Sequence, residues 1–577
     1  MSQRAAFLLA TIVTLAGCTD TPIKDGYTAP PRLDEAMIDP DAGGMTGGTG
    51  GMMAGGMGGM TGGAPSTNPL EITTDKGAVM GVSANGVRVW KGIPFAAPPT
   101  AENRFKPPQP VAAWTMTRDA SMPGNICPQN APSRGYLGEE DCLYLNVFAP
   151  DPAPAMPLPV MVWFHGGAFV FGSGSDMAYD GSNLVKRGNV VIVTVNYRLG
   201  ALGYLAHAGL ATAESSGNYG LLDQRAALTW VKNNIATFGG DAANVTIFGE
   251  SAGGRSVCWH LLTSGSHGLF HKAIIESGFC NKPTYSKADA EAQGARFATA
   301  VGCTDEAMAA TCLRGKPAME LVTAAVSMDP TPGGIFYQDR ATGFAFEPTI
   351  DGINITEQPG ATLAAGTGVA AVPVLQGANS DEGILFHVTV LGNVVPVMTE
   401  EEYVAALAQR YGQDAAAMIV AQYPIADFGD DPNAAITEAS GDGVFLCPAR
   451  QTAKLLAART GASTYLYNFS VPLAGIPVPA LEGTAFHSGE LPFVWGNPYA
   501  LGSVPPDKQA IADGLQDRFL QFARTGDPNP MGAMPAWPAY TADNDTLLSF
   551  GDTITTVMSH RKEQCDFWET VPPRDQP

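Results

Sequence analysis

One hexapeptide, residues 249–254, constrains the fold more than any other part of the chain; it reads G-E-S-A-G-G. It follows an apolar run at 244–248 that is typical of a strand, and it precedes a helix-like segment. Glycines on both sides of Ser251 permit a sharp strand-to-helix turn that exposes the hydroxyl and leaves the Ala252 N–H at a helix N-terminus. The pattern G-x-S-x-G also fits an ordinary glycine-rich turn, so other segments must decide between a nucleophile and a turn.

A second glycine motif lies upstream, at residues 165–169, which read H-G-G-A-F. The apolar run at 158–164 predicts a buried strand that leads directly into it. Small residues in such a loop let the backbone approach a substrate carbonyl. We therefore predict an oxyanion hole formed by the backbone N–H groups of Gly167, Ala168 and Ala252.

A nucleophilic serine needs a base, and in α/β-hydrolases the chain order is serine, acid, histidine. Of the histidines far enough beyond Ser251, His487 lies in a loop of small residues, whereas His387 and His560 fit structural or surface positions better. For the acid, a predicted strand at 372–377 leads into Asp381 and Glu382. The residues alone leave both carboxylates open.

Taken together, these segments resemble the type-B carboxylesterases, the cholinesterase-like branch of the α/β-hydrolases. The similarity runs from about Leu70 to the C-terminus. It also includes the segments K-G-I-P-F-A at 91–96, E-D-C-L-Y-L-N-V at 140–147, N-Y-R at 196–198, G-N-Y-G-L-L-D-Q at 217–224 and F-G-G-D at 238–241. The resemblance implies a large, mostly parallel central sheet flanked by helices, and hydrolysis of small-molecule carboxylic esters without metal or organic cofactor.

The resemblance also assigns individual roles. It implies Ser251 as nucleophile, His487 as general base and then acid, and Glu382 rather than Asp381 as the orienting carboxylate. Structural ion pairs are implied for Arg104 with Glu140, Arg198 with Asp223, and Asp442 with Arg561, and Glu250 and Glu490 are implied near the triad. The acyl pocket is expected near Phe344, Phe346, Leu385 and Phe386. Arg255 departs from the pattern, because relatives usually carry a small residue there.

Nine cysteines are present, and Cys18 is set apart by its position. The resemblance implies disulfides between Cys127 and Cys142, Cys303 and Cys312, and Cys447 and Cys565. Cys258 and Cys280 are left over. They form either a fourth disulfide or two buried free thiols.

The N-terminus predicts export. Residues 5–16 are apolar but too short to span a bilayer, and they end in L-A-G-C at 15–18, which resembles a bacterial lipobox. We expect a signal peptide at 1–17, lipidation of Cys18 and an outer-membrane address, with a simple secreted protein as the alternative. Residues 18–68 are rich in Gly and Met and predict a flexible tether, and residues 69–577 form the enzyme domain.

Charge and composition agree with an exported globular enzyme. The formal net charge of -22 argues against nucleic acid as a partner, and 45% hydrophobic residues can form a large core. Two other functions fit the same sequence. A catalytically inactive adhesion module is disfavoured because all three triad positions are filled, and an exported serine peptidase differs in the substrates it cleaves. The sequence indicates neither the natural ester nor the oligomeric state.

Overall fold

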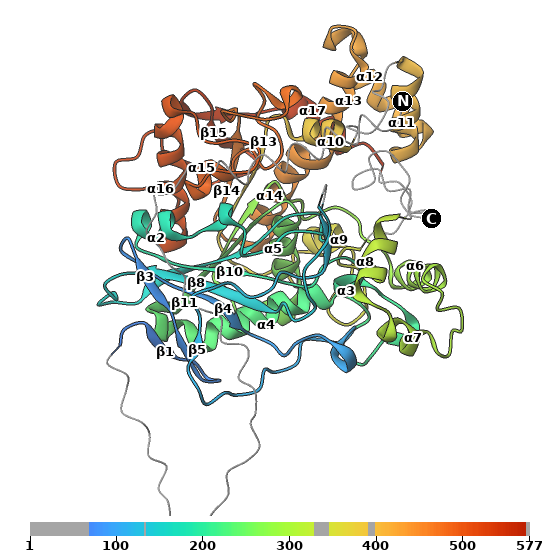
Figure 1. Cartoon of the computed structure of the whole chain (residues 1–577). Helices are drawn as coiled ribbons and strands as arrows, with labels where there is room; N and C mark the ends of the chain where they lie inside the picture. Colours follow the sequence, from blue (N-terminus) through green and yellow to red (C-terminus); the bar gives the residue numbers. More distant parts are fainter. Residues whose placement is uncertain (1–67, 132–133, 328–345, 391–398, 573–577) are drawn as a thin grey trace, which may run out of the picture.

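The computed structural model describes residues 68–131, 134–327, 346–390 and 399–572. Within them, an 11-stranded sheet forms the centre of the molecule (Figure 1). Its spatial order is β16-β15-β14-β13-β12-β11-β9-β10-β8-β4-β3. The strands are β3 (Val82–Ala84), β4 (Val87–Pro94), β8 (Tyr144–Pro150), β9 (Leu158–Phe164), β10 (Val191–Val195), β11 (Gly240–Glu250), β12 (Lys272–Glu276), β13 (Val374–Asn379), β14 (Thr464–Phe469), β15 (Thr546–Phe550) and β16 (Ile554–Met558).

The strands from β10 to β15 in this order are parallel to one another, and the outer strands β8, β4, β3 and β16 pair antiparallel. The predicted mostly parallel sheet of an α/β-hydrolase is therefore confirmed. Parallel strands bring their carboxyl ends to one edge of the sheet, which is where open α/β sheets build their sites. The segments that follow β9, β11, β13 and β14 all start from that edge.

Helices cover both faces of the sheet because its central strands are apolar on both sides. In β9, Val160 and Val162 belong to the core beneath α4 (Tyr219–Asn234) and α5 (Ala252–Leu262). The alternate residues Met161 and Trp163 pack on the other face, against α2 (Ser182–Gly188), α15 (Leu491–Trp495) and α16 (Gln509–Thr525). This alternation fixes which side of each strand faces which helix layer.

The remaining strands and helices lie around this central sheet. Two small sheets are formed by β1 (Glu71–Thr73), β2 (Ala78–Met80) and β5 (Arg118–Asp119), and by β6 (Gln129–Ala131) and β7 (Gly135–Leu137). The other α-helices are α3 (Gly200–Tyr204), α6 (Lys287–Ala300), α7 (Ala309–Gly315), α8 (Ala318–Ser327), α9 (Pro359–Ala365), α10 (Glu382–Val390), α11 (Glu400–Tyr411), α12 (Gln413–Gln422), α13 (Pro432–Gly441), α14 (Cys447–Thr460) and α17 (Lys562–Trp568). Helices α11 to α13 form a group with its own small core, at the upper right of Figure 1.

Four disulfides and several ion pairs, among them the three predicted ones, cross-link the described chain. The disulfides join Cys127 to Cys142, Cys258 to Cys280, Cys303 to Cys312, and Cys447 to Cys565. The three predicted pairs are confirmed, and the open question about Cys258 and Cys280 is answered by a fourth disulfide. The predicted ion pairs are also present, between Arg104 and Glu140, Arg198 and Asp223, and Arg561 and Asp442.

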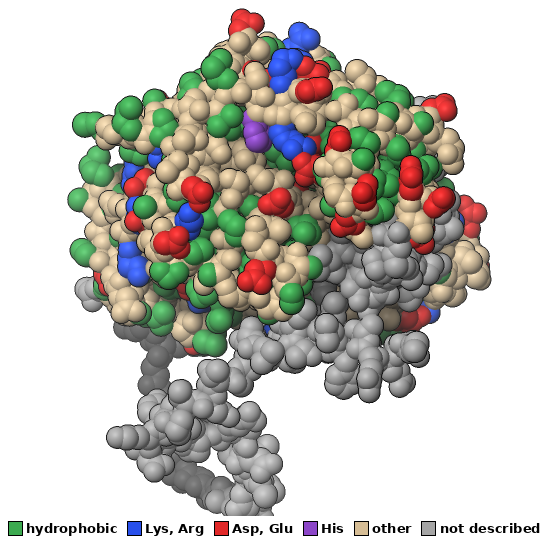
Figure 2. All heavy atoms as spheres, turned by 90° about the horizontal axis from the view of Figure 1, so that it is seen from above, with side chains coloured by type: hydrophobic (Ala, Val, Ile, Leu, Met, Phe, Trp, Pro, Cys, Tyr) green, Lys and Arg blue, Asp and Glu red, His purple; other side chains and the backbone are tan. Residues whose placement is uncertain are grey.

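Acidic side chains outnumber basic ones on the face seen in Figure 2, in keeping with the net charge of -22. Among the described residues, no helix combines the length and apolar character that crossing a membrane requires. The predicted signal peptide, Cys18 and the tether lie outside the described residues.

Candidate active site

Ser251 stands on a sharp turn between β11 and α5. Its backbone has φ 56° and ψ −119°, a strained conformation for a residue with a side chain. The two glycines of the motif are needed for close packing: a Cβ on Gly249 would lie 2.6 Å from the Phe164 carbonyl oxygen, and one on Gly253 would lie 1.9 Å from it. The turn therefore presses against the end of β9 and leaves Ser251 partly exposed.

His487 lies across the sheet edge from this turn, in the segment between β14 and α15. Its Nδ1 lies 2.5 Å from Oε2 of Glu382, the first residue of α10. The other carboxylate oxygen of Glu382 accepts the Asn379 backbone N–H at 2.7 Å. The Glu382 side chain is 0% exposed and the His487 side chain 4%, so this pair is shielded from water.

The neighbouring carboxylate, Asp381, has a different role. Its Oδ2 accepts the backbone N–H of Ala485 at 2.8 Å, and its own N–H donates to the Ala485 carbonyl at 3.1 Å. Asp381 thus fastens the histidine loop, while Glu382 contacts the imidazole. The two adjacent acids that sequence alone could not separate are distinguished by these contacts.

Two buried glutamates, Glu250 and Glu490, act on the imidazole in addition to Glu382. Oε1 of Glu250 lies 3.1 Å from His487 Nε2 and accepts a hydrogen bond from the Ser488 hydroxyl at 2.7 Å. The Glu250 contact lacks the alignment of a hydrogen bond, so Nε2 has no hydrogen-bond partner among the described residues. No hydrogen bond joins Nε2 to Ser251 in that part of the chain either, and such contacts often tighten only when substrate binds.

These charges set the protonation of the site. Burial lowers the pKa of His487, but the carboxylates of Glu250 and Glu382 outweigh burial and raise this pKa to about 9. Burial raises the pKa of Glu490 to about 8, with a further contribution from Glu250. Burial also raises the pKa of Glu276 well above its ordinary value. Glu276, which is 0% exposed, is a residue that sequence reasoning missed; its position at the end of an apolar run was the available signal.

The loop at 165–171 runs beside Ser251. A Cβ on Gly166 would lie 3.3 Å from the Ser251 Cβ, and the loop turns sharply through positive φ at Gly167 (101°), Ala168 (54°) and Phe169 (64°). The backbone N–H groups of Gly167, Ala168 and Ala252 donate no hydrogen bond to any described residue. Unsatisfied N–H groups beside a nucleophile can stabilise a developing negative charge.

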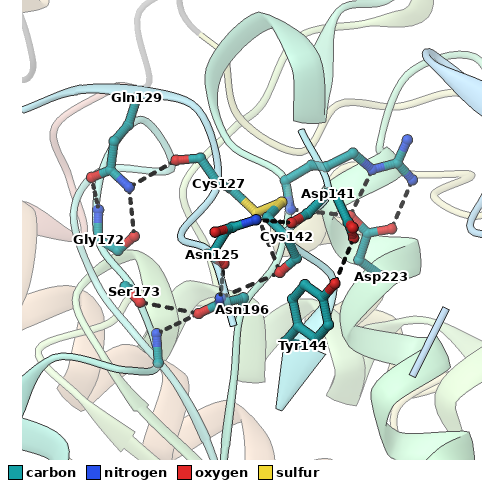
Figure 3. The surroundings of a disulfide bond; sticks show 12 residues. Asn125, Cys127, Gln129, Asp141, Cys142, Tyr144, Gly172, Ser173, Asn196 and Asp223 are labelled. Atoms are coloured by element: carbon teal, nitrogen blue, oxygen red, sulfur yellow. Dashed lines mark hydrogen bonds and ion pairs between the residues drawn. A yellow bond between two sulfur atoms is a disulfide. The ribbon is translucent and has the colours of Figure 1, made fainter. Parts of the chain in front are cut away.

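The Cys127–Cys142 disulfide supports this loop from outside (Figure 3). The Gln129 side chain accepts the Gly172 N–H at 2.8 Å and donates to the Gly172 carbonyl at 3.0 Å. The same side chain also donates to the Cys127 carbonyl at 3.0 Å. The Gln129 amide therefore ties the disulfide segment to the end of the loop. The Asn196 side chain adds a second tie, since it donates to the Asn125 and Cys142 carbonyls and accepts from Ser173 and Gly174.

Of the residues predicted near the acyl pocket, Phe344 lies outside the described residues. Phe346 is 3% exposed and packs edge-to-face on Phe297 in the main core, and Leu385 packs against the core of the opposite sheet face. Phe386 lies beside the His487 ring, with ring centroids 4.9 Å apart. Phe445 lies on the same imidazole at 4.8 Å, and sequence reasoning did not single it out.

Arg255, the departure noted in the sequence, is buried one turn after Ser251 on α5. Its Nη1 forms an ion pair with Oε2 of Glu347. The guanidinium also lies over the rings of Phe169 and Phe279, at 5.8 and 5.0 Å from their centroids. The residue is therefore part of the wall around the elbow rather than a surface charge.

Comparison with known proteins identifies the family of this chain. Residues 68–568 match the carboxylesterase family. This chain belongs to that family. Its relatives include the para-nitrobenzyl esterase of Bacillus subtilis (strain 168), 37% identical over 84% of this chain and 95% of the relative. An acetylcholinesterase of Bungarus fasciatus is 34% identical, over 88% of this chain and 87% of the relative.

A solved structure gives the same result for the fold. A PNB esterase structure superposes with a TM-score of 0.75 at 36% identity, covering 87% of this chain and all of that one. As a member of the carboxylesterase family, the protein is a carboxylic ester hydrolase that acts on small-molecule esters. Among the residues described, no group of three His, Cys, Asp or Glu side chains is arranged to hold a metal ion.

Proposed function

We propose that the protein is a serine esterase that works through an acyl-enzyme, with Ser251, His487 and Glu382 as its triad. The observation that carries this proposal is the buried Glu382–His487 contact at 2.5 Å. It leaves Nε2 without a hydrogen-bond partner among the described residues, at the edge of the sheet where Ser251 is partly exposed. A carboxylate on Nδ1 fixes the tautomer in which Nε2 accepts a proton.

The reaction consists of an acylation step and a deacylation step. Ser251 Oγ attacks the ester carbonyl as His487 Nε2 takes its proton, and the N–H groups of Gly167, Ala168 and Ala252 bind the oxyanion of the tetrahedral intermediate. The imidazolium, balanced by Glu382, then gives its proton to the leaving alcohol. Water then attacks the acyl-enzyme as it gives a proton to His487. The imidazolium returns this proton to Ser251 Oγ as the acid leaves.

A screen of substrates tests the reaction class. The purified protein is expected to turn over 4-nitrophenyl esters and not peptide 4-nitroanilides that carry the same acyl group. The nitrophenolate and nitroaniline products are both read by absorbance, so the two rates are compared directly. Cleavage of the anilides at a similar rate would assign a peptidase instead, and cleavage of neither would favour a binding module.

Activity is expected to rise with pH through the titration of His487. Only neutral His487 can accept the serine proton, and its pKa is raised above the ordinary value of about 6.5, so the acid limb of kcat/KM lies above that pH. Glu250→Gln removes a negative charge 3.1 Å from Nε2 and is expected to move the limb to lower pH. A limb that stays in place in this variant would show that Glu250 does not act on the imidazole.

We also propose that the protein is a lipoprotein, with cleavage before Cys18 and an outer-membrane anchor. The support is the L-A-G-C sequence at 15–18 followed by about 50 residues of Gly- and Met-rich chain. Cys18→Ser is expected to move the enzyme from the membrane to the soluble fraction after detergent-free lysis. Retention of the variant in the membrane fraction would contradict the anchor.

A further inference from the structure

Arg255 is a buried charged residue directly beside the nucleophile. It follows Ser251 by one helical turn, and its backbone N–H donates to the Ser251 carbonyl at 2.8 Å. This bond closes the first turn of α5 on Ser251, and the contact with the Phe169 ring places the Arg255 guanidinium beside the oxyanion loop. The Arg255 side chain is only 7% exposed.

The guanidinium bridges the two sides of the site. On one side it lies over Phe169, which directly follows the oxyanion-loop residue Ala168. On the other it lies over Phe279, whose ring packs edge-to-face on Phe445 at 5.6 Å. Phe445 in turn lies against the His487 ring, so Arg255 links the oxyanion loop to the aromatic side chains beside the histidine.

The direction of the acyl chain in a bound ester follows from the positions of the oxyanion loop and His487. A bound ester directs its carbonyl oxygen toward the oxyanion loop and its leaving oxygen toward His487. The remaining substituent on the carbonyl carbon, the acyl chain, must point away from both. The wall that joins the oxyanion loop to the histidine side on α5 is formed by Phe169, Arg255 and Phe279.

The hydrogen-bonding capacity of Arg255 is largely unused. Its Nη1 pairs with Glu347, and Nε and Nη2 have no hydrogen-bond partner among the described residues. A guanidinium has five N–H donors in a planar fork that suits carbonyl and carboxylate oxygens. Donors that no described residue occupies are available to a ligand that supplies an acceptor.

We infer that Arg255 is a specificity-determining residue that selects acyl groups carrying a second carbonyl or carboxylate oxygen. The inference rests on the proposed esterase function and names its substrate class: monoesters of dicarboxylic acids and esters of oxo acids. The acyl chain runs along the row of side chains formed by Phe169, Arg255 and Phe279, and its distal oxygen accepts hydrogen bonds from the free edge of the guanidinium.

Three ethyl esters of nearly equal size test this inference: ethyl pentanoate, ethyl 4-oxopentanoate and ethyl hydrogen succinate. Their acyl chains differ in bearing no acceptor, a ketone or a carboxylate. For the wild-type enzyme, kcat/KM for at least one acceptor-bearing ester is expected to exceed that for ethyl pentanoate by about tenfold or more. Whichever acceptor gains more identifies the group that the natural acyl chain carries.

Arg255→Met keeps an unbranched apolar stem and removes the hydrogen-bond donors, and it is expected to bring this ratio close to one. The double variant Arg255→Met/Glu347→Gln gives the same readout without leaving the Glu347 carboxylate short of its arginine partner. Arg450→Met is the matched control, since Arg450 is similarly buried and paired, with Asp545, but contacts no residue of the site. The control is expected to keep the wild-type ratio.

Two results would overturn the inference: equal kcat/KM for all three esters in the wild type, or an acceptor preference that survives in both Arg255 variants. Both leave the esterase itself intact, whereas failure of the wild type to hydrolyse any ester would instead contradict the proposed function. A ratio is used so that a general loss of activity in a variant does not affect the result.

Discussion

Ser251→Ala is expected to reduce ester turnover by about 10⁴-fold or more while the protein stays folded. The elbow is held by backbone contacts that alanine retains: the Ser251 N–H donates to the Glu276 carbonyl at 2.9 Å, and the Ser251 carbonyl accepts the Arg255 N–H. Alanine also occupies the same region of φ and ψ no worse than serine. Steady-state rates and thermal unfolding curves of both proteins check the two halves of this expectation.

Ser256→Ala is the control for this variant. Ser256 lies on the same helix, is fully buried and bonds to Gln224 and the Ala252 carbonyl rather than to any triad residue. This variant is expected to lose some thermal stability and to keep its catalytic rate within about tenfold. A Ser251→Ala protein that retains wild-type turnover would remove Ser251 from the mechanism.

Glu382→Gln is the second variant with a large expected effect. A neutral amide can neither balance the imidazolium nor hold the tautomer that leaves Nε2 as acceptor, and the equivalent change in a serine protease triad costs about 10⁴-fold in kcat. Asp381→Asn removes a similar charge one residue earlier but keeps an oxygen that can accept the Ala485 N–H. It is expected to cost less than about tenfold.

The comparison of these two variants separates the acid from its neighbour. Both are measured as kcat on the same 4-nitrophenyl ester, with unfolding midpoints taken alongside. If Asp381→Asn proved the more damaging in folded protein, the acid would have to be reassigned to Asp381.

Local sequence was sufficient to predict the turns of the site that are formed by consecutive residues. The glycines around Ser251 and in the 165–169 loop predict their turns because the close backbone contacts at Gly249, Gly253 and Gly167 leave no room for a Cβ. The parallel sheet was implied through the family resemblance, and the order of its strands confirms it. The three disulfides that the resemblance implied are confirmed by the observed cysteine pairs.

Contacts between distant segments could not be predicted from local sequence. Choosing between Asp381 and Glu382 depends on which side chain faces a loop about 100 residues later, and pairing Cys258 with Cys280 depends on how α5 packs on the segment after β12. Arg255 became interpretable only when Glu347 and two aromatic rings were placed around it. Predictions that fall on residues 1–67 and on Phe344 remain predictions.

The central claim, an acyl-enzyme on Ser251, is tested most directly by trapping that intermediate. Enzyme mixed with excess 4-nitrophenyl acetate is quenched in acid during turnover, and its intact mass and peptides are measured by mass spectrometry. We predict a single acetyl group on the peptide that contains Ser251, absent from the Ser251→Ala protein, and a nitrophenolate burst of about one equivalent per chain. Turnover with no acetylated Ser251 peptide and no burst, or with the acetyl group on another residue, would contradict the account.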